Sequence, residues 1–219
     1  MSIAVLIDSF KGSLSSLEAG NIIKEAITKI NKNENITVKP IADGGEGMVE
    51  SLSDLKGADI IKVEVKDPLL RDIEAEYIVV DNEEISEDKI AIIEMSSASG
   101  LTLIANELSP IKASTYGVGD IIIDALDRGV KEYIIGIGGS ATNDAGIGML
   151  TRLGVKFLDD DNQPVHPSAE GIKDLKFIDA SSLDPRIKEC KFSIACDVTN
   201  PLVGKNGSAY IFGPQKGAD

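Results

Sequence analysis

The sequence feature that most constrains the fold is a recurring unit, a short apolar run followed by a polar, glycine-rich turn. Such turns occupy residues 8–12, 42–47, 136–144 and 195–200. Short runs rich in Ile and Val are typical of strands buried in a parallel sheet. Because the carboxyl ends of parallel strands share one edge, and ligands bind at that edge, we expect these turns to meet in one crevice.

The order of elements predicts an α/β protein of two domains. Residues 3–55 have a strand–helix–strand–helix pattern, which is typical of a doubly wound parallel sheet. Between residues 58 and 100, three β-rich runs follow one another without a helical pattern, which favours an antiparallel or mixed sheet. We therefore expect a discontinuous Rossmann-like domain at 1–57 and 101–158, and a smaller mixed β-rich α/β domain with a meander at 58–100 and 159–219.

Local signals predict where several helices and strands begin and end. Ser15 and Glu18 have the spacing of a capping box, so the first helix should begin there. Apolar residues recur with helical spacing from Val118 to Leu126, and Gly129 supplies a C-terminal stop. Apolar runs at 131–137, 155–158 and 192–196 predict further strands, and a helix is expected at 144–153.

Composition narrows the possible partners. The chain has 36 acidic and 22 basic residues and a net charge of −14, which disfavours nucleic acid and anionic membranes. The sequence carries no signal for an oligomeric state. The opening residues do not resemble a signal peptide and no apolar window reaches membrane-spanning length, so we expect a cytoplasmic protein. The single histidine, His166, lies in a polar loop, which argues against His-based triads and multi-His metal sites.

The residue types in the glycine-rich turns are suited to phosphoryl transfer. Glycines let backbone N–H groups approach phosphate or carboxylate oxygens, a lysine offers a point charge, and aspartates can hold Mg²⁺ or accept the proton of an attacking hydroxyl. The residues that we expect in the crevice are Asp8, Ser9, Lys11, Asp43, Gly44, Gly45, Gly138, Gly139, Ser140, Asn143, Asp144 and Asp197. For each turn alone, a tight connection or a helix cap explains the same residues, and this alternative stays open.

A second interpretation of one turn is a dinucleotide site. Gly136, Gly138 and Ala141 after a strand, with Asp159 about 20 residues further on, imitate the Rossmann fingerprint. The spacing match is weak, because glycine-rich strand–helix turns are common. In addition, Asp144 would bring a carboxylate to the place that a pyrophosphate has to occupy. A dinucleotide-dependent oxidoreductase is therefore the less favoured alternative.

Long, ordered motifs resemble the glycerate kinase family over residues 3–218. They read DSFKGSLSSLEA, PIADGGEGMVESL, STYGVGDIIIDALDRG, IGIGGSATNDAGIGMLTRLG and ACDVTNPLVGKNGSAYIFGPQKGA. The resemblance implies two α/β domains with the active site between them. It also implies ATP-dependent phosphorylation of D-glycerate, with 2-phosphoglycerate as the favoured product. Family members continue beyond the last motif, so we expect this chain to be an N-terminal portion, truncated at its C-terminus. A catalytically incomplete fragment that binds a hydroxy acid or a phosphate is therefore the alternative.

Within that reaction, roles can be suggested for individual residues. Asp197 is the expected base for the glycerate hydroxyl, and Asp8 and Asp43 are the expected metal ligands. Lys11 and Ser9 would hold the substrate carboxylate or the transferring phosphoryl group, with Asp8, Lys11 and Asp197 as the catalytic set. The turn from Gly138 to Asp144 would contact substrate or phosphates, and Lys216 would reach the nucleotide.

Overall fold

The structure, a computed structural model, describes residues 2–10, 13–42, 44–45 and 47–218. Its strands are β1 (Ser2–Ile7), β2 (Asn35–Pro40), β3 (Ala58–Lys66), β4 (Asp72–Val80), β5 (Ile90–Glu94), β6 (Glu132–Gly136), β7 (Lys156–Leu158), β8 (Phe177–Asp179) and β9 (Lys191–Ala195). Its α-helices are α1 (Ser16–Ile30), α2 (Met48–Leu52), α3 (Ser96–Ser99), α4 (Tyr116–Asp127), α5 (Ile147–Arg152), α6 (Ala169–Ile172) and α7 (Ser208–Phe212). Short 3₁₀ helices are η1 (Leu101–Ile104), η2 (Pro185–Glu189) and η3 (Pro214–Lys216).

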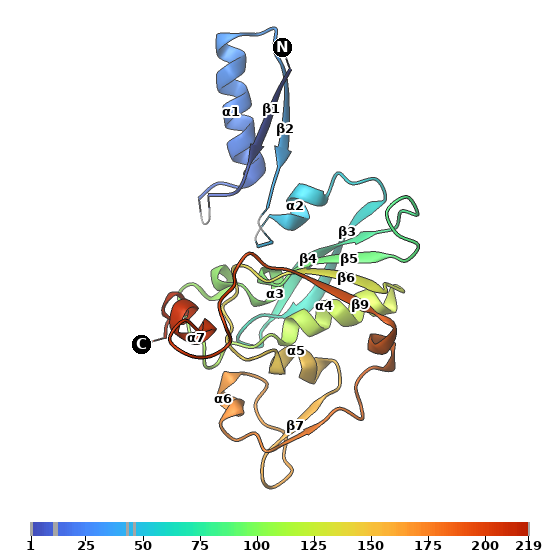
Figure 1. Ribbon diagram of the computed structural model, residues 1–219, viewed down its shortest axis with the longest axis vertical. Coiled ribbons are helices and arrows are strands. Elements are labelled where there is room, and N and C mark those ends of the chain that lie inside the picture. Colours follow the sequence, from blue (N-terminus) through green and yellow to red (C-terminus); the bar gives the residue numbers. More distant parts are fainter. Residues whose placement is uncertain (1, 11–12, 43, 46, 219) are drawn as a thin grey trace.

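The largest sheet has five strands in the order β3-β4-β5-β6-β9. The β3–β4 and β4–β5 pairs are antiparallel, as the meander pattern predicts, and β5, β6 and β9 run parallel to one another. Helix α4 covers one face of this sheet (Figure 1). The α/β class with a mixed sheet is therefore confirmed.

The first strands form a separate unit, the N-terminal arm (residues 2–10 and 13–40 of the described chain). Strands β1 and β2 pair in parallel from Ser2–Asn35 to Ile7–Pro40, and α1 packs beside them. The arm extends away from the rest of the molecule (Figure 1). Ser15 caps α1, and Ser15 and Glu18 form the predicted capping box, with each side chain bonded to the other residue's backbone N–H.

Strand β6 pairs differently from the expected domain grouping. The sequence pattern grouped residues 101–158 with the N-terminal strands, but β6 pairs with β5 and β9, outside the β1–β2 sheet. The physical reason is that strand neighbours are chosen by long-range packing, on which local periodicity carries no information. The expected boundaries between two domains stay a prediction.

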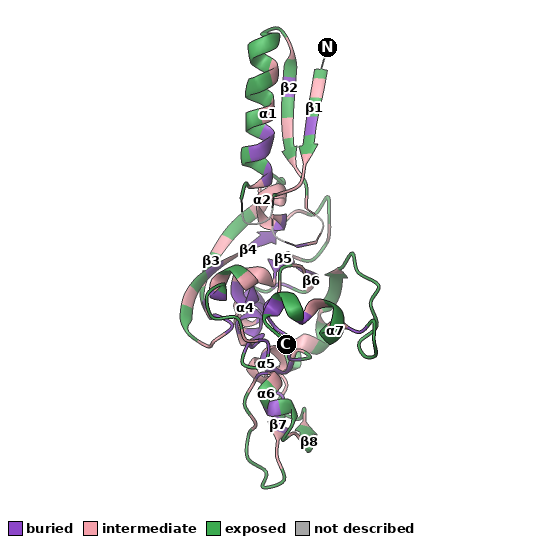
Figure 2. Ribbon diagram, turned by 90° about the vertical axis from the view of Figure 1, so that its left-hand side faces the viewer, coloured by how far each residue is buried: buried purple, intermediate pink, exposed green. Residues whose placement is uncertain are grey.

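The apolar core lies between the central sheet and α4. Its side chains come from β3, β4, β5, β6 and α4, and Tyr77, Ile93 and Ile121 in it are fully buried. Buried residues gather in this central region, whereas most of the arm is exposed (Figure 2). Among the described residues, no helix combines the length and apolar character needed to cross a membrane.

Candidate functional site

Three of the four glycine-rich turns touch one another. Gly138 N–H, after β6, donates a hydrogen bond of 3.3 Å to the carbonyl of Gly44, which follows β2. A Cβ on Gly138 would lie 2.6 Å from Gly45 Cα, and one on Gly44 would lie 3.0 Å from the carbonyl oxygen of Ala195 at the end of β9. Gly138 has no room for a side chain, and at Gly44 a Cβ would be tight and the backbone has a positive φ of 92°, so glycine allows these backbones to approach so closely.

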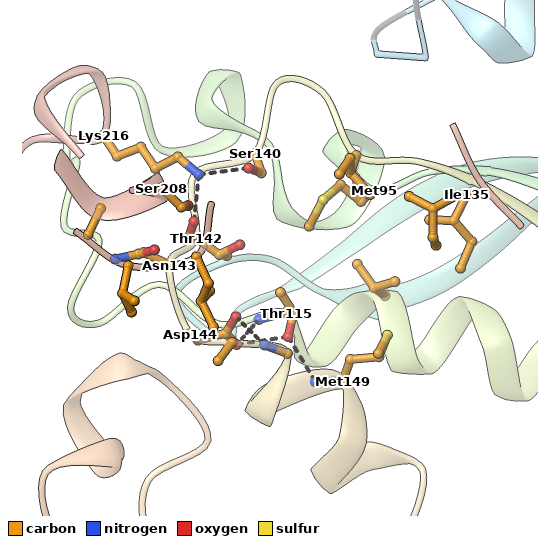
Figure 3. A pocket seen from close by; sticks show the side chains of 18 residues that line it. Met95, Thr115, Ile135, Ser140, Thr142, Asn143, Asp144, Met149, Ser208 and Lys216 are labelled. Carbon is orange, nitrogen blue, oxygen red and sulfur yellow. Dashed lines mark hydrogen bonds between the residues drawn. The ribbon is translucent and has the colours of Figure 1, made fainter. Parts of the chain in front are cut away.

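Beside these turns the structure has a cavity of about 600 Å³. Its lining includes Ser140, Asn143, Asp144 and Lys216, four of the residues selected from the sequence. The first three belong to the turn after β6, whereas Lys216 comes from η3, near the other end of the chain (Figure 3). The fold thus brings part of the predicted set around one space.

Lys216 is the cationic member of the described lining residues and is 8% exposed. Its Nζ donates hydrogen bonds to Ser140 Oγ at 2.8 Å and to the carbonyl of Thr142 at 2.6 Å. Burial lowers the pKa of Lys216, because the ammonium loses water, and the negative charge of Asp144 offsets part of that effect. A desolvated cation held in this way is suited to binding an anion.

Asp144 is buried and its carboxylate is already well bonded. It accepts hydrogen bonds from the backbone N–H of Thr115 at 2.9 Å, from Thr115 Oγ1 at 2.8 Å, and from the N–H groups of Gly146 and Gly148 at 3.2 Å each. Helix α5 begins at Ile147, three residues later than the sequence pattern suggested, so this carboxylate lies at its N-terminal end. An anionic side chain there disfavours a dinucleotide pyrophosphate at the N-terminal end of α5, which is where the Rossmann fingerprint would place it.

The remaining predicted residues are less closely gathered. Asp8 follows β1 and its Oδ1 accepts a 2.6 Å hydrogen bond from Ser9 N–H. The Oγ of Ser9 is buried and has no hydrogen-bond partner in the described part of the chain, so a ligand could bond to it. Asp197 is exposed in the segment after β9. Gly139 adopts a positive φ of 69° in the turn after β6. Lys11 and Asp43 lie outside the described residues.

Sequence reasoning missed Thr115, which organises this side of the site. Thr115 precedes α4, and its Oγ1 both donates to Asp144 and accepts from Met149 N–H at 2.9 Å. The residue therefore ties α4 to the turn after β6 and to α5. The one feature of the sequence that points to Thr115 is its place in the STYGVGD motif.

The side chains that could bind a metal ion can be compared with the expectation of a Mg²⁺ site. Within residues 2–10, 13–42, 44–45 and 47–218, no group of three or more His, Cys, Asp or Glu side chains could hold a metal ion. Asp8 offers a carboxylate of the kind that Mg²⁺ prefers, and the other expected ligand, Asp43, is not described. The chemistry of this pair fits Mg²⁺.

Comparison with known proteins gives a consistent result. A family model described as the glycerate kinase family matches residues 3–219. A curated glycerate kinase of Halalkalibacterium halodurans is 46% identical over 99% of this chain, and a glycerate 2-kinase of Escherichia coli K12 is 42% identical over all of it. In both cases the chain spans 56% of the relative's length.

A solved structure is similar over the whole chain. The crystal structure assigned to glycerate kinase 2 from Salmonella typhimurium LT2 superposes with a TM-score of 0.81 at 41% identity, and covers 100% of this chain and 57% of that one. Agreement in sequence and in fold extends over the whole of this chain. The chain belongs to the glycerate kinase family.

Proposed function

We propose that the protein to which this chain belongs phosphorylates D-glycerate with ATP, with 2-phosphoglycerate as the favoured product. The observation that carries the proposal is the meeting of the Gly44, Gly138 and Ala195 backbones beside a cavity that holds the buried Lys216 ammonium. A chain with a net charge of −14 must create local positive potential to bind two anionic substrates. Backbone N–H groups and one desolvated lysine can create it.

In the proposed reaction, the Asp197 carboxylate takes the proton of the glycerate hydroxyl. The hydroxyl oxygen then forms a bond to the γ-phosphorus, and the bond between that phosphorus and the oxygen bridging to the β-phosphate breaks, which leaves ADP. Lys216 and the N–H groups of the turn at Gly138 and Gly139 hold anionic oxygens in place. The unpartnered Ser9 Oγ is positioned to hydrogen-bond the substrate carboxylate or the transferring group.

Mg²⁺, when bound, would neutralise charge on the phosphates, and Asp8 together with Asp43 would provide its carboxylate ligands. The proposed role of Asp8 is supported by its position after β1 and by the hydrogen bond that its carboxylate accepts from Ser9 N–H. A cytoplasmic location is proposed along with this activity.

The test is an assay of ADP release in the presence of ATP, Mg²⁺ and D-glycerate, with the phosphorylated hydroxyl identified by NMR. ADP formation that depends on D-glycerate supports the proposal, and NMR distinguishes the 2-phosphate from the 3-phosphate. Because the chain spans 56% of its relatives' length, a non-catalytic binding function is the second candidate. Thermal stabilisation by glycerate or phosphate without ADP release would favour that candidate over the kinase.

A further inference from the structure

The cavity beside the turns has two chemically different ends. One end is formed by side chains of Met95, Ile135 and Met149, with Val118 and Ile194 also in the lining. Lys216, Ser140, Asn143 and Ser208 lie together toward the other end (Figure 3). The two ends are continuous within about 600 Å³, so a single molecule can contact both.

We propose that this cavity is the nucleotide site, with the purine base against the apolar end and the phosphates directed to Lys216. This inference rests on the proposed function and deepens it, because it says which of the two substrates occupies the cavity. Glycerate then binds outside this cavity.

The apolar end of the cavity favours a purine base over glycerate. Each of the three carbons of glycerate carries oxygen, so the molecule has no apolar face to bury. Placing its hydroxyl or carboxyl groups against Ile135 and Met149 would remove water from them without replacing the lost hydrogen bonds. A purine base has two flat faces that pack favourably on Met and Ile side chains. Sites of roughly 300–1,000 Å³ usually hold molecules much larger than glycerate.

The polar end has the charge that a phosphate requires. In the part of the chain that the structure describes, no carboxylate oxygen lies within 4.0 Å of Lys216 Nζ. The bonds that Nζ does make, to Ser140 Oγ and the Thr142 carbonyl, are to neutral acceptors. A buried ammonium whose hydrogen-bond partners are all neutral gains from an arriving anion, because the anion restores interactions lost with water.

Competition binding with a fluorescent ADP analogue tests whether the nucleotide lies in the cavity in this orientation. Adenosine, ADP, inorganic tripolyphosphate and D-glycerate are each used to displace the analogue from this chain. Lys216→Met should weaken ADP and tripolyphosphate at least about tenfold and leave adenosine within about twofold. Ile194→Ser should weaken adenosine and ADP about threefold or more and leave tripolyphosphate unchanged. Ile194 is 54% exposed, so this substitution is compatible with folding.

Matched controls separate local from general effects. Lys205→Met removes one exposed positive charge from the segment before α7, and Ile178→Ser changes a 62% exposed isoleucine on β8 outside the cavity lining. Neither should change any of the affinities more than about twofold. Retained adenosine binding by Lys216→Met shows an intact cavity. If that variant does not fold, Lys216→Arg, which keeps the charge, should retain tripolyphosphate binding.

Three results would overturn the nucleotide site. They are failure of the chain to bind the analogue, displacement of the analogue by D-glycerate in competition, and unchanged adenosine affinity in Ile194→Ser. The ADP-release assay is independent of these results. ADP release that depends on D-glycerate, together with variant affinities equal to those of the unmodified chain, would refute the site and leave the kinase function standing. If the variants show the expected changes in affinity but no ADP is released, the nucleotide site is supported and the kinase function is refuted.

Discussion

The N-terminal arm and the central sheet are both α/β structure, but they are stabilised differently. In the arm the buried apolar side chains are Val5, Ala19 and Ile36, and α1 keeps Ile22 55% exposed. In the central region Ile93 and Ile121 are fully buried in a shared cluster between sheet and helix. The central region therefore gains more of its stability from apolar burial than the arm does.

The largest expected effect is on the central core. Ile121→Ala removes a fully buried side chain from α4 and leaves a cavity against the sheet, which should lower the free energy of unfolding by about 2–5 kcal/mol. The matched change in the arm, Ile22→Ala at a 55% exposed position, should cost less than about 0.5 kcal/mol. Urea denaturation followed by circular dichroism measures both. Equal losses in the two variants would contradict the difference between the regions.

The second prediction tests whether the central sheet and the arm both contribute to catalysis. It rests on the proposed kinase function. Asp197 follows β9 of the central sheet and Asp8 follows β1 of the arm. In a protein that shows glycerate-dependent ADP release, Asp197→Asn should lower kcat at least about a hundredfold, because the hydroxyl loses its base. Asp8→Asn should also lower kcat and raise the Mg²⁺ concentration needed for half-maximal rate.

Two exposed aspartates that belong to neither the arm nor the central sheet provide the controls for that experiment. Asp54→Asn and Asp160→Asn change side chains that are 82% and 78% exposed, and both should keep near-normal turnover. Near-normal kcat in Asp197→Asn would remove this residue from the mechanism. A normal Mg²⁺ dependence in Asp8→Asn would remove the arm from the metal site.

Local sequence patterns predict the elements of this fold better than the contacts between them. With the exception of β8, which was not predicted, the strands, the capping box at Ser15 and the stop of α4 near Gly129 follow from local patterns, and the structure confirms them. The parallel-strand rule predicts that the turns approach one another, as Gly44, Gly138 and Ala195 do, but it does not predict which side chains bond. Thr115 and Asp144 are 29 residues apart, and Lys216 and Ser140 are 76 apart. No periodicity encodes such distances, because these contacts form only once the sheet has been assembled.

Asp144 shows that a place beside a cavity does not by itself reveal what a side chain does. The sequence pattern favours an acidic residue near a phosphate site, and the carboxylate does line the cavity. However, its oxygens accept hydrogen bonds from Thr115, Gly146 and Gly148, which fix the turn after β6. A role in binding stays a prediction, whereas a role in positioning follows from the bonds that the structure shows.

A third prediction concerns a polar pair in the central region, the buried Tyr77 and the partly buried Asp124. Tyr77 Oη donates a 2.6 Å hydrogen bond to Asp124 Oδ2, and Arg128 Nε donates to the same oxygen at 2.7 Å. Burial alone would raise the pKa of Asp124, but the hydrogen bonds from Arg128 and Tyr77 outweigh it and hold that pKa below its ordinary value of 3.8. Tyr77→Phe should cost about 1–2 kcal/mol at pH 7.

The pH dependence of that cost follows from the lowered pKa. A carboxyl group with a depressed pKa in the folded state stabilises the protein at pH values above its unfolded pKa, and this contribution is lost as the pH falls through the folded value. The difference in unfolding free energy between the unmodified chain and Tyr77→Phe should therefore shrink below about pH 4. Urea titrations at pH 7 and at pH 3 measure it, and a cost that does not change with pH would refute the bond to an ionised Asp124.

The smallest expected effect is on the stability of the arm. Ser15 Oγ accepts from Glu18 N–H at 3.2 Å in the capping box and also donates to Glu50 Oε1 of α2 at 3.1 Å, so it joins α1 to the helix that packs on the central sheet. Ser15→Ala should lower stability by about 1 kcal/mol. Thr28→Ala, an exposed change within α1, should cost less than about 0.5 kcal/mol. Hydrogen exchange can locate the loss. Faster exchange confined to α1 and β2 would mean that the arm opens as its own unit, whereas faster exchange that includes β5 and α4 would show that arm and central sheet unfold together.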